Sequence, residues 1–247
     1  MSDPSDPDYR FSHQSSGYGK RYAQRYLRGY YAVQWQKLEK PLLAKVFAEL
    51  GTNAKTCLDF ACGTGRITAF ESGHFAHVTG VDISSAMLAD APACPNVEYV
   101  CRDITKEPLG RRFDVVTSFR FFLNAQADLR TAALKAIGAH LAPGGTLVLN
   151  VHMNAGSPTG LAIRLGHRLT GRRLHNVLSL KELTQELNDT GYVVERVTWY
   201  SFMPRPGRLI GDFVSPAMEA VEHLWRGLGV FKSAGQSFLV LAKRADP

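Results

Sequence analysis

C-L-D-F-A-C-G-T-G-R-I-T, residues 57–68, is a short apolar strand that passes through small residues and two glycines into a helix. Gly63 and Gly65 permit a positive φ and carry no Cβ, so a ligand can lie against their backbone. A loop leading straight into a helix also presents unpaired N–H groups and the positive end of the helix dipole. Asp59 adds a carboxylate there, which would repel a pyrophosphate. The stretch therefore predicts a pocket for a ligand with a cationic amine and a planar nucleoside.

Apolar strands and helices alternate on both sides of this stretch. We expect strands at residues 56–60, 77–81, 97–101, 113–118, 146–151, 192–202 and 236–243. We expect helices at residues 33–50 (with a kink at Pro41), 65–72, 84–91, 127–141, 158–175 and 179–189, and a last one that begins at Pro216. The continuous apolar run at 146–151 is typical of parallel strands covered on both faces. The alternation predicts an α/β fold with a doubly wound, mostly parallel sheet.

Composition bounds the class of protein. With 247 residues, 45% hydrophobic and 21% charged, the chain has the composition of an ordinary soluble globular protein. No apolar run approaches the roughly 20 residues that cross a bilayer, and the N-terminal residues lack an apolar signal core. The four cysteines show no C-x-x-C spacing, so we expect reduced thiols in a cytoplasmic protein and no metal site.

Positive charge is concentrated in the second half of the chain. The net charge is +7, and no acidic residue lies between Asp128 and Glu182, whereas seven Lys and Arg residues do. Such a field favours a phosphorylated or carboxylated substrate, a membrane surface or nucleic acid, and the alternative is a solvated basic face. Residues 158–175 would form a basic amphipathic helix, which favours peripheral contact with a membrane.

The domain organisation expected is a mobile N-terminal arm or lid at residues 1–30 and one domain at 31–247. Residues 17–31 interleave tyrosines with arginines, and Tyr18, Tyr22 and Tyr26 would form one stripe on a helix. That stripe either packs on the core or closes over a ligand with its phenol hydroxyls. Within the domain, we expect insertions on the acceptor side at about 155–178 and 202–234.

Three carboxylates follow the first three expected strands: Asp59, Asp82 and Asp103. In an open α/β sheet, ligands bind beyond the carboxyl ends of the strands. Asp82 can accept hydrogen bonds from both hydroxyls of a ribose, and Asp103 with Ile104 can meet the amine and one face of adenine. A single acid there is more often a helix cap, but three in sequence after a glycine loop indicate a nucleoside site.

These residues carry a family resemblance. L-D-F-A-C-G-T-G-R, G-V-D-I-S, C-R-D-I, F-D-V-V-T-S-F and L-A-P-G-G-T-L-V-L-N resemble the class I S-adenosylmethionine-dependent methyltransferases over roughly residues 55–155. The chain departs from the family pattern at Ala61, which replaces the first glycine. The resemblance implies a Rossmann-like, seven-stranded sheet with an antiparallel last strand, which fits residues 236–243, and a helical lid insertion.

The resemblance also implies where S-adenosylmethionine binds. Gly63 and Gly65 would lie against its methionine part, Asp59 near the ammonium, Asp82 at the ribose, and Phe119 on the methionine side. Together with Tyr22 of the N-terminal segment, the expected cofactor-binding residues are Asp59, Ala61, Gly63, Gly65, Asp82, Ile83, Asp103, Ile104 and Phe119.

A nicotinamide dehydrogenase is the competing class of enzyme. Its G-x-G-x-x-G fingerprint would require a third glycine at position 68, where this chain has Thr68. Asp59 would also face the pyrophosphate. Both residues disfavour this class.

The sequence says less about catalysis. The enzyme's main task is to hold the acceptor in line with the methyl group. His152, just past the fifth strand, is the candidate general base, although it could equally form only a hydrogen bond in a loop. Arg120 could pair with a substrate anion or the cofactor carboxylate. Asn124 lacks the N-P-P-[YF] context of base N-methyltransferases, which disfavours a DNA acceptor.

The cationic segment at 158–175 and the apolar insertion at 202–234 predict an amphiphilic acceptor: a small or lipid-like molecule with an anionic group, with O-methylation slightly favoured. An RNA acceptor is the alternative within enzymes, although no RNA-binding appendage is recognisable. A catalytically silent S-adenosylmethionine-binding subunit is the alternative outside enzymes. The sequence leaves open the methylated atom and the oligomeric state.

Overall fold

The computed structural model describes residues 9–11, 14–15, 17–24, 26–27, 29–171, 175–203, 220–225 and 232–245. Its helices and turns are η1 (Tyr9–Phe11), α1 (Tyr18–Gln24), α2 (Gly29–Val33), η2 (Gln34–Glu39), α3 (Lys40–Leu50), η3 (Thr52–Ala54), α4 (Arg66–Glu71), α5 (Ser85–Leu88), α6 (Ala127–His140), α7 (Pro158–Thr170), α8 (Leu180–Asp189) and η6 (Lys232–Ala234). Its strands are β1 (Thr56–Phe60), β2 (His77–Asp82), β3 (Val97–Cys101), β4 (Phe113–Ser118), β5 (Leu141–Val151), β6 (Tyr192–Tyr200) and β7 (Ser237–Arg244).

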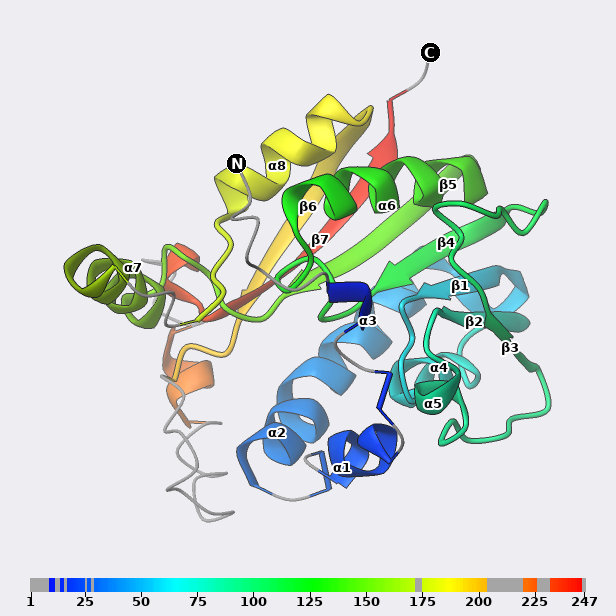
Figure 1. Cartoon of the computed structure of the whole chain (residues 1–247), viewed down its shortest axis with the longest axis horizontal. Helices are drawn as coiled ribbons and strands as arrows, with labels where there is room; N and C mark the ends of the chain where they lie inside the picture. Colours follow the sequence, from blue (N-terminus) through cyan, green and yellow to red (C-terminus); the bar gives the residue numbers. More distant parts are fainter. Residues whose placement is uncertain are drawn as a thin grey trace.

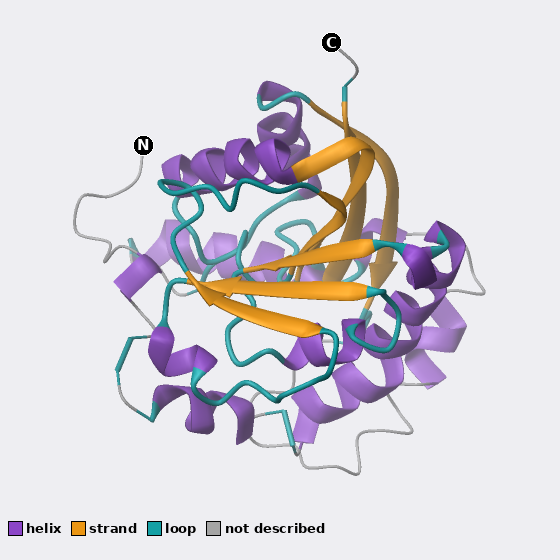
Figure 2. Ribbon diagram, turned by 90° about the vertical axis from the view of Figure 1, so that its right-hand side faces the viewer, coloured by secondary structure: helices purple, strands orange, loops and turns teal. Residues whose placement is uncertain are grey.

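The strands form one seven-stranded sheet in the order β3-β2-β1-β4-β5-β7-β6. Strand β7 is antiparallel to both of its neighbours, and the other described pairings are parallel. Helices cover both faces, with α6 and α8 on one side and α3 and α4 on the other (Figures 1 and 2). The doubly wound sheet with an antiparallel last strand is therefore confirmed. The strand order reverses between β1 and β4, which is where such sheets bind ligands.

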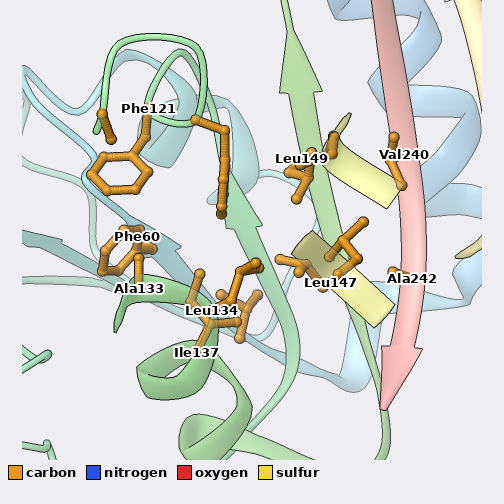
Figure 3. Packing of buried hydrophobic residues seen from close by; sticks show 14 of the residues in the cluster. Phe60, Phe121, Ala133, Leu134, Ile137, Leu147, Leu149, Val240 and Ala242 are labelled. Atoms are coloured by element: carbon orange, nitrogen blue, oxygen red, sulfur yellow. The ribbon is translucent and has the colours of Figure 1, made fainter. Parts of the chain in front are cut away.

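Two apolar layers hold the helices on the sheet. In the first, Leu134 and Ile137 of α6 pack against Leu147 and Leu149 of β5 (Figure 3). In the second, Phe47 of α3 lies among core residues that include Trp35, Val78 and Val148. Fully burying one such side chain stabilises the fold by about 1.5–3 kcal/mol. The sheet is thus fixed from both faces, and its strand ends are rigid supports for a site.

Several expected bounds required correction. The helix expected at 84–91 ends at Leu88, since Pro92 disfavours helical conformation at the residue before it. Helix α7 ends at Thr170 rather than His175, because Gly171 adopts a left-handed φ of 64° and its N–H bonds the carbonyl of His167. Strand β5 begins at Leu141, which pairs with Phe113 before a register shift.

The helix expected at 33–50 is interrupted by a π-helical turn. The stretch Gln34–Glu39 is π-helical, and the N–H of Lys40 bonds the carbonyl of Trp35, five residues back. Pro41 then occupies the first turn of α3, where its missing N–H is tolerated. The irregularity expected at Pro41 therefore lies in the preceding turn.

Parts of the expected insertions lie outside the described residues. This holds for residues 172–174 of the first insertion and for most of 202–234, including the helix start at Pro216. Residues 220–225 are helical. The division into an arm at 1–30 and a domain at 31–247 stays a prediction.

Candidate functional site

A cavity opens at the carboxyl ends of β1, β2, β3 and β4. It encloses about 1050 Å³, its open mouth included. The walls come from the loop after β1, the ends of β2 and β3, the loop after β4, and η1: Tyr9, Arg10, Asp59, Phe60, Ala61, Cys62, Gly63, Thr64, Arg66, Ile67, Val81, Asp82, Ile83, Ser84, Met87, Arg102, Asp103, Ile104, Thr105, Phe119, Arg120, Phe121 and Leu129. Segments far apart in the sequence therefore share one concave site, as is typical of ligand pockets.

The glycine loop has an unusual backbone that explains its composition. Ala61, Gly63 and Gly65 all have positive φ, at 58°, 60° and 68°. Gly63 lines the cavity, whereas Gly65 does not. A Cβ on Gly65 would lie 2.5 Å from the hydroxyl of Tyr99, so this glycine permits close packing against β3. Only Gly63 of the two is thus placed to lie against a ligand.

Asp82 is held by the backbone at the end of β2. Its Oδ2 accepts a hydrogen bond from the N–H of Gly63 at 2.8 Å, and its Oδ1 accepts one from the N–H of Ser84 at 2.8 Å. Burial raises the pKa of Asp82, and these backbone bonds oppose the rise. A carboxylate offers about four acceptor positions, so it can accept further hydrogen bonds from a ligand. The two bonds fix the carboxylate and tie the glycine loop to β2.

Asp103 and Ile104 occupy the end of β3. The Oδ1 of Asp103 accepts a hydrogen bond from the N–H of Thr105 at 3.1 Å, which forms a local turn. Its Oδ2 lies 3.7 Å from Lys106 and 4.0 Å from Arg10. Ile104 is buried and contributes to the apolar wall of the cavity. The pair offers a polar edge beside an apolar surface.

Asp59 forms a buried carboxyl pair with a residue that the sequence analysis did not identify. Its Oδ2 accepts a hydrogen bond from the hydroxyl of Thr68 at 2.6 Å. Glu71 of α4 is also fully buried nearby, and the negative charge of Asp59 adds to burial in raising the pKa of Glu71. Burial above all, with the charge of Asp82 as a smaller cause, raises the pKa of Asp59 to about 7. Thr68, which stands where a dehydrogenase has glycine, thus serves as a donor to the first acid.

The turn η1 also lines the cavity. Tyr9 packs edge-on against Phe121 with 5.9 Å between ring centroids, and its N–H bonds the side chain of Gln126. Burial raises the pKa of Tyr9, and the neighbouring charge of Asp82 adds to the rise. Sequence analysis missed Tyr9 and Arg10, because the polar composition around them is typical of a mobile arm. The adjacent aromatic and cationic residues Tyr9 and Arg10 were the sequence signal that could have indicated a binding role.

Two guanidinium groups in the cavity wall rest on aromatic rings. The Cζ of Arg66 lies 4.3 Å from the ring centroid of Tyr26 and 4.3 Å from that of Trp35. The Cζ of Arg120 lies 5.2 Å from the ring of Tyr26 and 5.7 Å from that of Tyr31. Cation–π contacts of this kind are attractive. They attach the N-terminal aromatic residues to two parts of the cavity wall, the start of α4 and the loop after β4.

Arg120 also belongs to a buried polar network. Its guanidinium donates hydrogen bonds to both carboxylate oxygens of Glu39, at 3.1 and 3.3 Å. The backbone N–H of Arg120 donates to the side-chain oxygen of Asn150. The hydroxyl of Tyr200 donates to the same carboxylate at 3.2 Å. The charge of Arg120, expected to meet a substrate anion or the cofactor carboxylate, is therefore matched within the protein by Glu39.

The cavity brings together most of the residues expected to hold a cofactor. Those that line it are Asp59, Ala61, Gly63, Asp82, Ile83, Asp103, Ile104 and Phe119. Gly65 is not among the lining residues and packs against Tyr99, and the side chain of Tyr22 lies outside the described part of the structure. His152, the expected base, is 7% exposed and is not among the lining residues. The cofactor-binding roles and the catalytic role stay predictions.

Known proteins match the part of the chain that builds most of this cavity. Residues 57–145 match the family model described as a methyltransferase domain. The chain is 34% identical over 134 residues to a dTDP-4-amino-2,3,4,6-tetradeoxy-D-glucose N,N-dimethyltransferase of Saccharopolyspora spinosa, covering 51% of this chain and 53% of that protein. Residues 57–145 therefore carry a methyltransferase domain, and the chain is similar to the class I S-adenosylmethionine-dependent methyltransferases. S-adenosylmethionine is the cofactor of this family.

Other methyltransferases align with shorter parts of the chain or with its fold. A malonyl-[acyl-carrier protein] O-methyltransferase of Bacillus anthracis is 33% identical over 94 residues, which are 36% of this chain and 35% of that protein. The solved N-methyltransferase NodS of Bradyrhizobium japonicum, in complex with S-adenosylhomocysteine, gives a TM-score of 0.58 at 14% identity and covers 84% of this chain and 86% of its own. The chain spans about half the length or less of the curated relatives named here.

Two features are absent from the part of the chain that the structure describes. No described helix combines the length and apolarity that crossing a membrane requires. Among the described residues, no three His, Cys, Asp or Glu side chains are grouped so that they could hold a metal ion.

Proposed function

We propose that this methyltransferase-family protein transfers the methyl group of S-adenosylmethionine to a small or lipid-like acceptor that is amphiphilic or anionic. The observation that carries this proposal is that Asp59, Asp82 and Asp103 meet at one cavity with Gly63, within the region that matches the methyltransferase domain. Bound S-adenosylmethionine would supply a methyl group activated by a positive sulfonium. The chain's own task is then to bind, orient and exclude water.

Each acid has a proposed role in binding. Asp82, fixed by two backbone N–H groups, would accept hydrogen bonds from the ribose hydroxyls. Asp103 would meet the adenine amine, and Ile104 would cover one face of the ring. Asp59 would neutralise the ammonium, and Phe119 would lie along the methionine chain. These roles make the cavity complementary to a nucleoside that carries a cation.

The acceptor proposal draws on the relatives and on the surface of the chain. The two relatives named above are described as acting on an amino sugar nucleotide and on a malonyl thioester carrier. In this chain, Phe202 and Trp225 stack with 5.9 Å between their ring centroids outside the cavity lining, and we propose that this apolar segment contacts the acceptor. O-methylation is the first reaction to test, with N-methylation the other outcome. RNA as acceptor and a catalytically silent binding subunit are the alternatives. We propose that the protein is located in the cytoplasm, because its four cysteines are free thiols and cytoplasmic cysteines are usually reduced.

Thermal shift measurements test the cofactor. A ligand at about 100 times its Kd adds roughly 2.7 kcal/mol to the free energy of unfolding. For a chain of this size, that corresponds to a Tm increase of about 5 °C or more. We expect this increase with S-adenosylmethionine and S-adenosylhomocysteine, and none with NAD. A shift with NAD alone would refute the proposal. Binding without transfer to any acceptor in a broad panel would support the silent subunit.

Cofactor affinity should depend on pH through Asp59. Its raised pKa of about 7 means that the carboxyl is mostly neutral at pH 6 and becomes anionic above pH 7. An anionic Asp59 attracts the cofactor ammonium, so the Kd of S-adenosylhomocysteine should fall several-fold between about pH 6 and about pH 7.5, below the usual pKa of an α-amino group. Calorimetric titration measures this. Asp59→Asn should remove the dependence, as should 5′-methylthioadenosine, which lacks the ammonium.

Removal of His152 tests its role as general base. His152→Ala should lower turnover by about 10²-fold or more and leave the Kd of S-adenosylhomocysteine unchanged, because the base acts on the acceptor. His140→Ala is the matched control, since His140 is also buried but accepts a hydrogen bond from the N–H of Leu109. It should lower stability and leave turnover per folded molecule intact. Unchanged turnover in His152→Ala would remove His152 from the mechanism.

A further inference from the structure

Helix α7 turns a row of leucines toward solvent. Leu161, Leu165 and Leu169 are 56%, 57% and 77% exposed, and their spacing of four residues places them on one face of the helix. We call these three residues the leucine stripe. They are three of the seven exposed large hydrophobic residues in the described part of the chain. Scattered exposed hydrophobics are ordinary, but a row on one helix indicates a surface that contacts something.

The leucine stripe does not attach α7 to the rest of the protein. Gly160 faces inward, where a Cβ would lie 2.0 Å from the carbonyl oxygen of Asn154. Ile163 packs against the core, and Ser157 caps the helix through a 3.0 Å hydrogen bond from the N–H of Gly160. The helix lies at one end of the molecule, beyond the sheet (Figure 1). It is therefore fixed by a different face and presents the leucine stripe outward.

Charge indicates what this surface contacts. Arg168 is exposed on α7 between Leu165 and Leu169, and Arg164 lies one turn earlier, 2.8 Å from Glu182. No acidic residue occurs anywhere from 129 to 181. An apolar stripe bordered by arginines is the pattern of helices that lie in the interface of an anionic bilayer, with leucines in the acyl boundary and arginines at the phosphates. Contact between two copies would need the apolar row but not the absence of acidic residues from the sequence 129–181.

We propose that α7 binds the protein to the surface of anionic membranes. The leucine stripe enters the acyl boundary, and Arg168 contacts lipid phosphates. This activity goes beyond methyl transfer, because it needs neither the cofactor cavity nor an acceptor. It would also bring the molecule to a surface where amphiphilic acceptors are concentrated.

Vesicle co-sedimentation tests the proposal with the full chain. We expect partitioning onto phosphatidylcholine vesicles containing roughly one-third phosphatidylglycerol to exceed that onto pure phosphatidylcholine by about tenfold. The triple variant Leu161→Gln, Leu165→Gln, Leu169→Gln should lose at least about tenfold on the anionic vesicles. Val193→Gln is the matched control, since Val193 of β6 is 53% exposed, and it should bind like wild type. Arg168→Glu should weaken only the binding to anionic vesicles.

Three results would overturn the proposal. One is that the wild type does not bind anionic vesicles, or that the triple variant binds them as well as the wild type does. Another is a dimer in light scattering that the triple variant converts to a monomer without any vesicle binding, which would make the stripe an interface between copies. A third is binding of single-stranded RNA but not vesicles, lost in Arg168→Glu. The thermal shift with S-adenosylhomocysteine should be the same in every variant, so it separates failure here from failure of the proposed function.

Discussion

Asp82→Ala should weaken the binding of S-adenosylhomocysteine by about a hundredfold or more. Hydrogen bonds to a charged group contribute roughly 1.5–3 kcal/mol each, and two to the ribose hydroxyls would be lost. A change of about 1.4 kcal/mol is a factor of ten in Kd. The substitution also removes the acceptor of the Gly63 N–H, so the glycine loop loses one of its hydrogen bonds to β2 and keeps the one from the Cys62 N–H to the carbonyl of Val81. Calorimetric titration with S-adenosylhomocysteine measures the loss.

A matched control distinguishes the loss of a ligand contact from the loss of a hydrogen bond that holds a strand in place. Asp114, at the start of β4, accepts hydrogen bonds from the N–H and hydroxyl of Thr56 at 2.8 and 2.9 Å. It does not line the cavity. Asp114→Ala should lower stability but leave the Kd unchanged. If Asp82→Ala bound as tightly as Asp114→Ala, the ribose assignment would be wrong.

Glu39→Ala should destabilise the protein by about 3–5 kcal/mol. The side chains of Glu39 and Arg120 are 3% and 9% exposed, and removing one partner of a buried ion pair leaves an uncompensated charge. The hydroxyl of Tyr200 loses its acceptor as well. Urea unfolding measures the change as a lower midpoint with an unchanged slope.

Two further variants define what the Glu39–Arg120 pair contributes. Glu39→Leu with Arg120→Met should be more stable than Glu39→Ala alone, because apolar residues of similar volume can replace a buried pair. The exposed pair of Glu49 and Arg196 supplies the control, and Glu49→Ala should have a much smaller effect because solvent screens that pair. Equal losses for Glu39→Ala and Glu49→Ala would show that the buried network contributes no more than a surface contact.

Local patterns were sufficient to predict the sheet and most of the cavity. The strands Val97–Cys101 and Phe113–Ser118 have the bounds expected from their apolar runs. The start of the helix expected at 179–189 was predictable because it depends on a local feature, a capping box of Ser179 and Glu182 within one turn. The acids at the ends of β1, β2 and β3 meet because parallel neighbouring strands end at the same edge.

What the sequence could not supply depends on contacts between distant residues. Glu39 and Arg120 are 81 positions apart, and no local pattern relates them. The pairing of Glu71 with Asp59 requires the orientation of α4, a helix of six residues. Tyr9 reaches the cavity only because Phe121 and Gln126 lie where η1 passes. In each case the tertiary arrangement creates the relation.

The π-helical turn Gln34–Glu39 sets the rotational register between two parts of one continuous helical segment. Regular α-helix advances by about 100° per residue, so deleting one residue there would rotate everything upstream by that angle. Glu39 would stay in phase with α3 and keep its ion pair with Arg120. Trp35 would swing away from Arg66, which it now contacts at 4.3 Å. One inserted residue thus lets the same segment engage both Arg66 and Arg120 of the cavity wall.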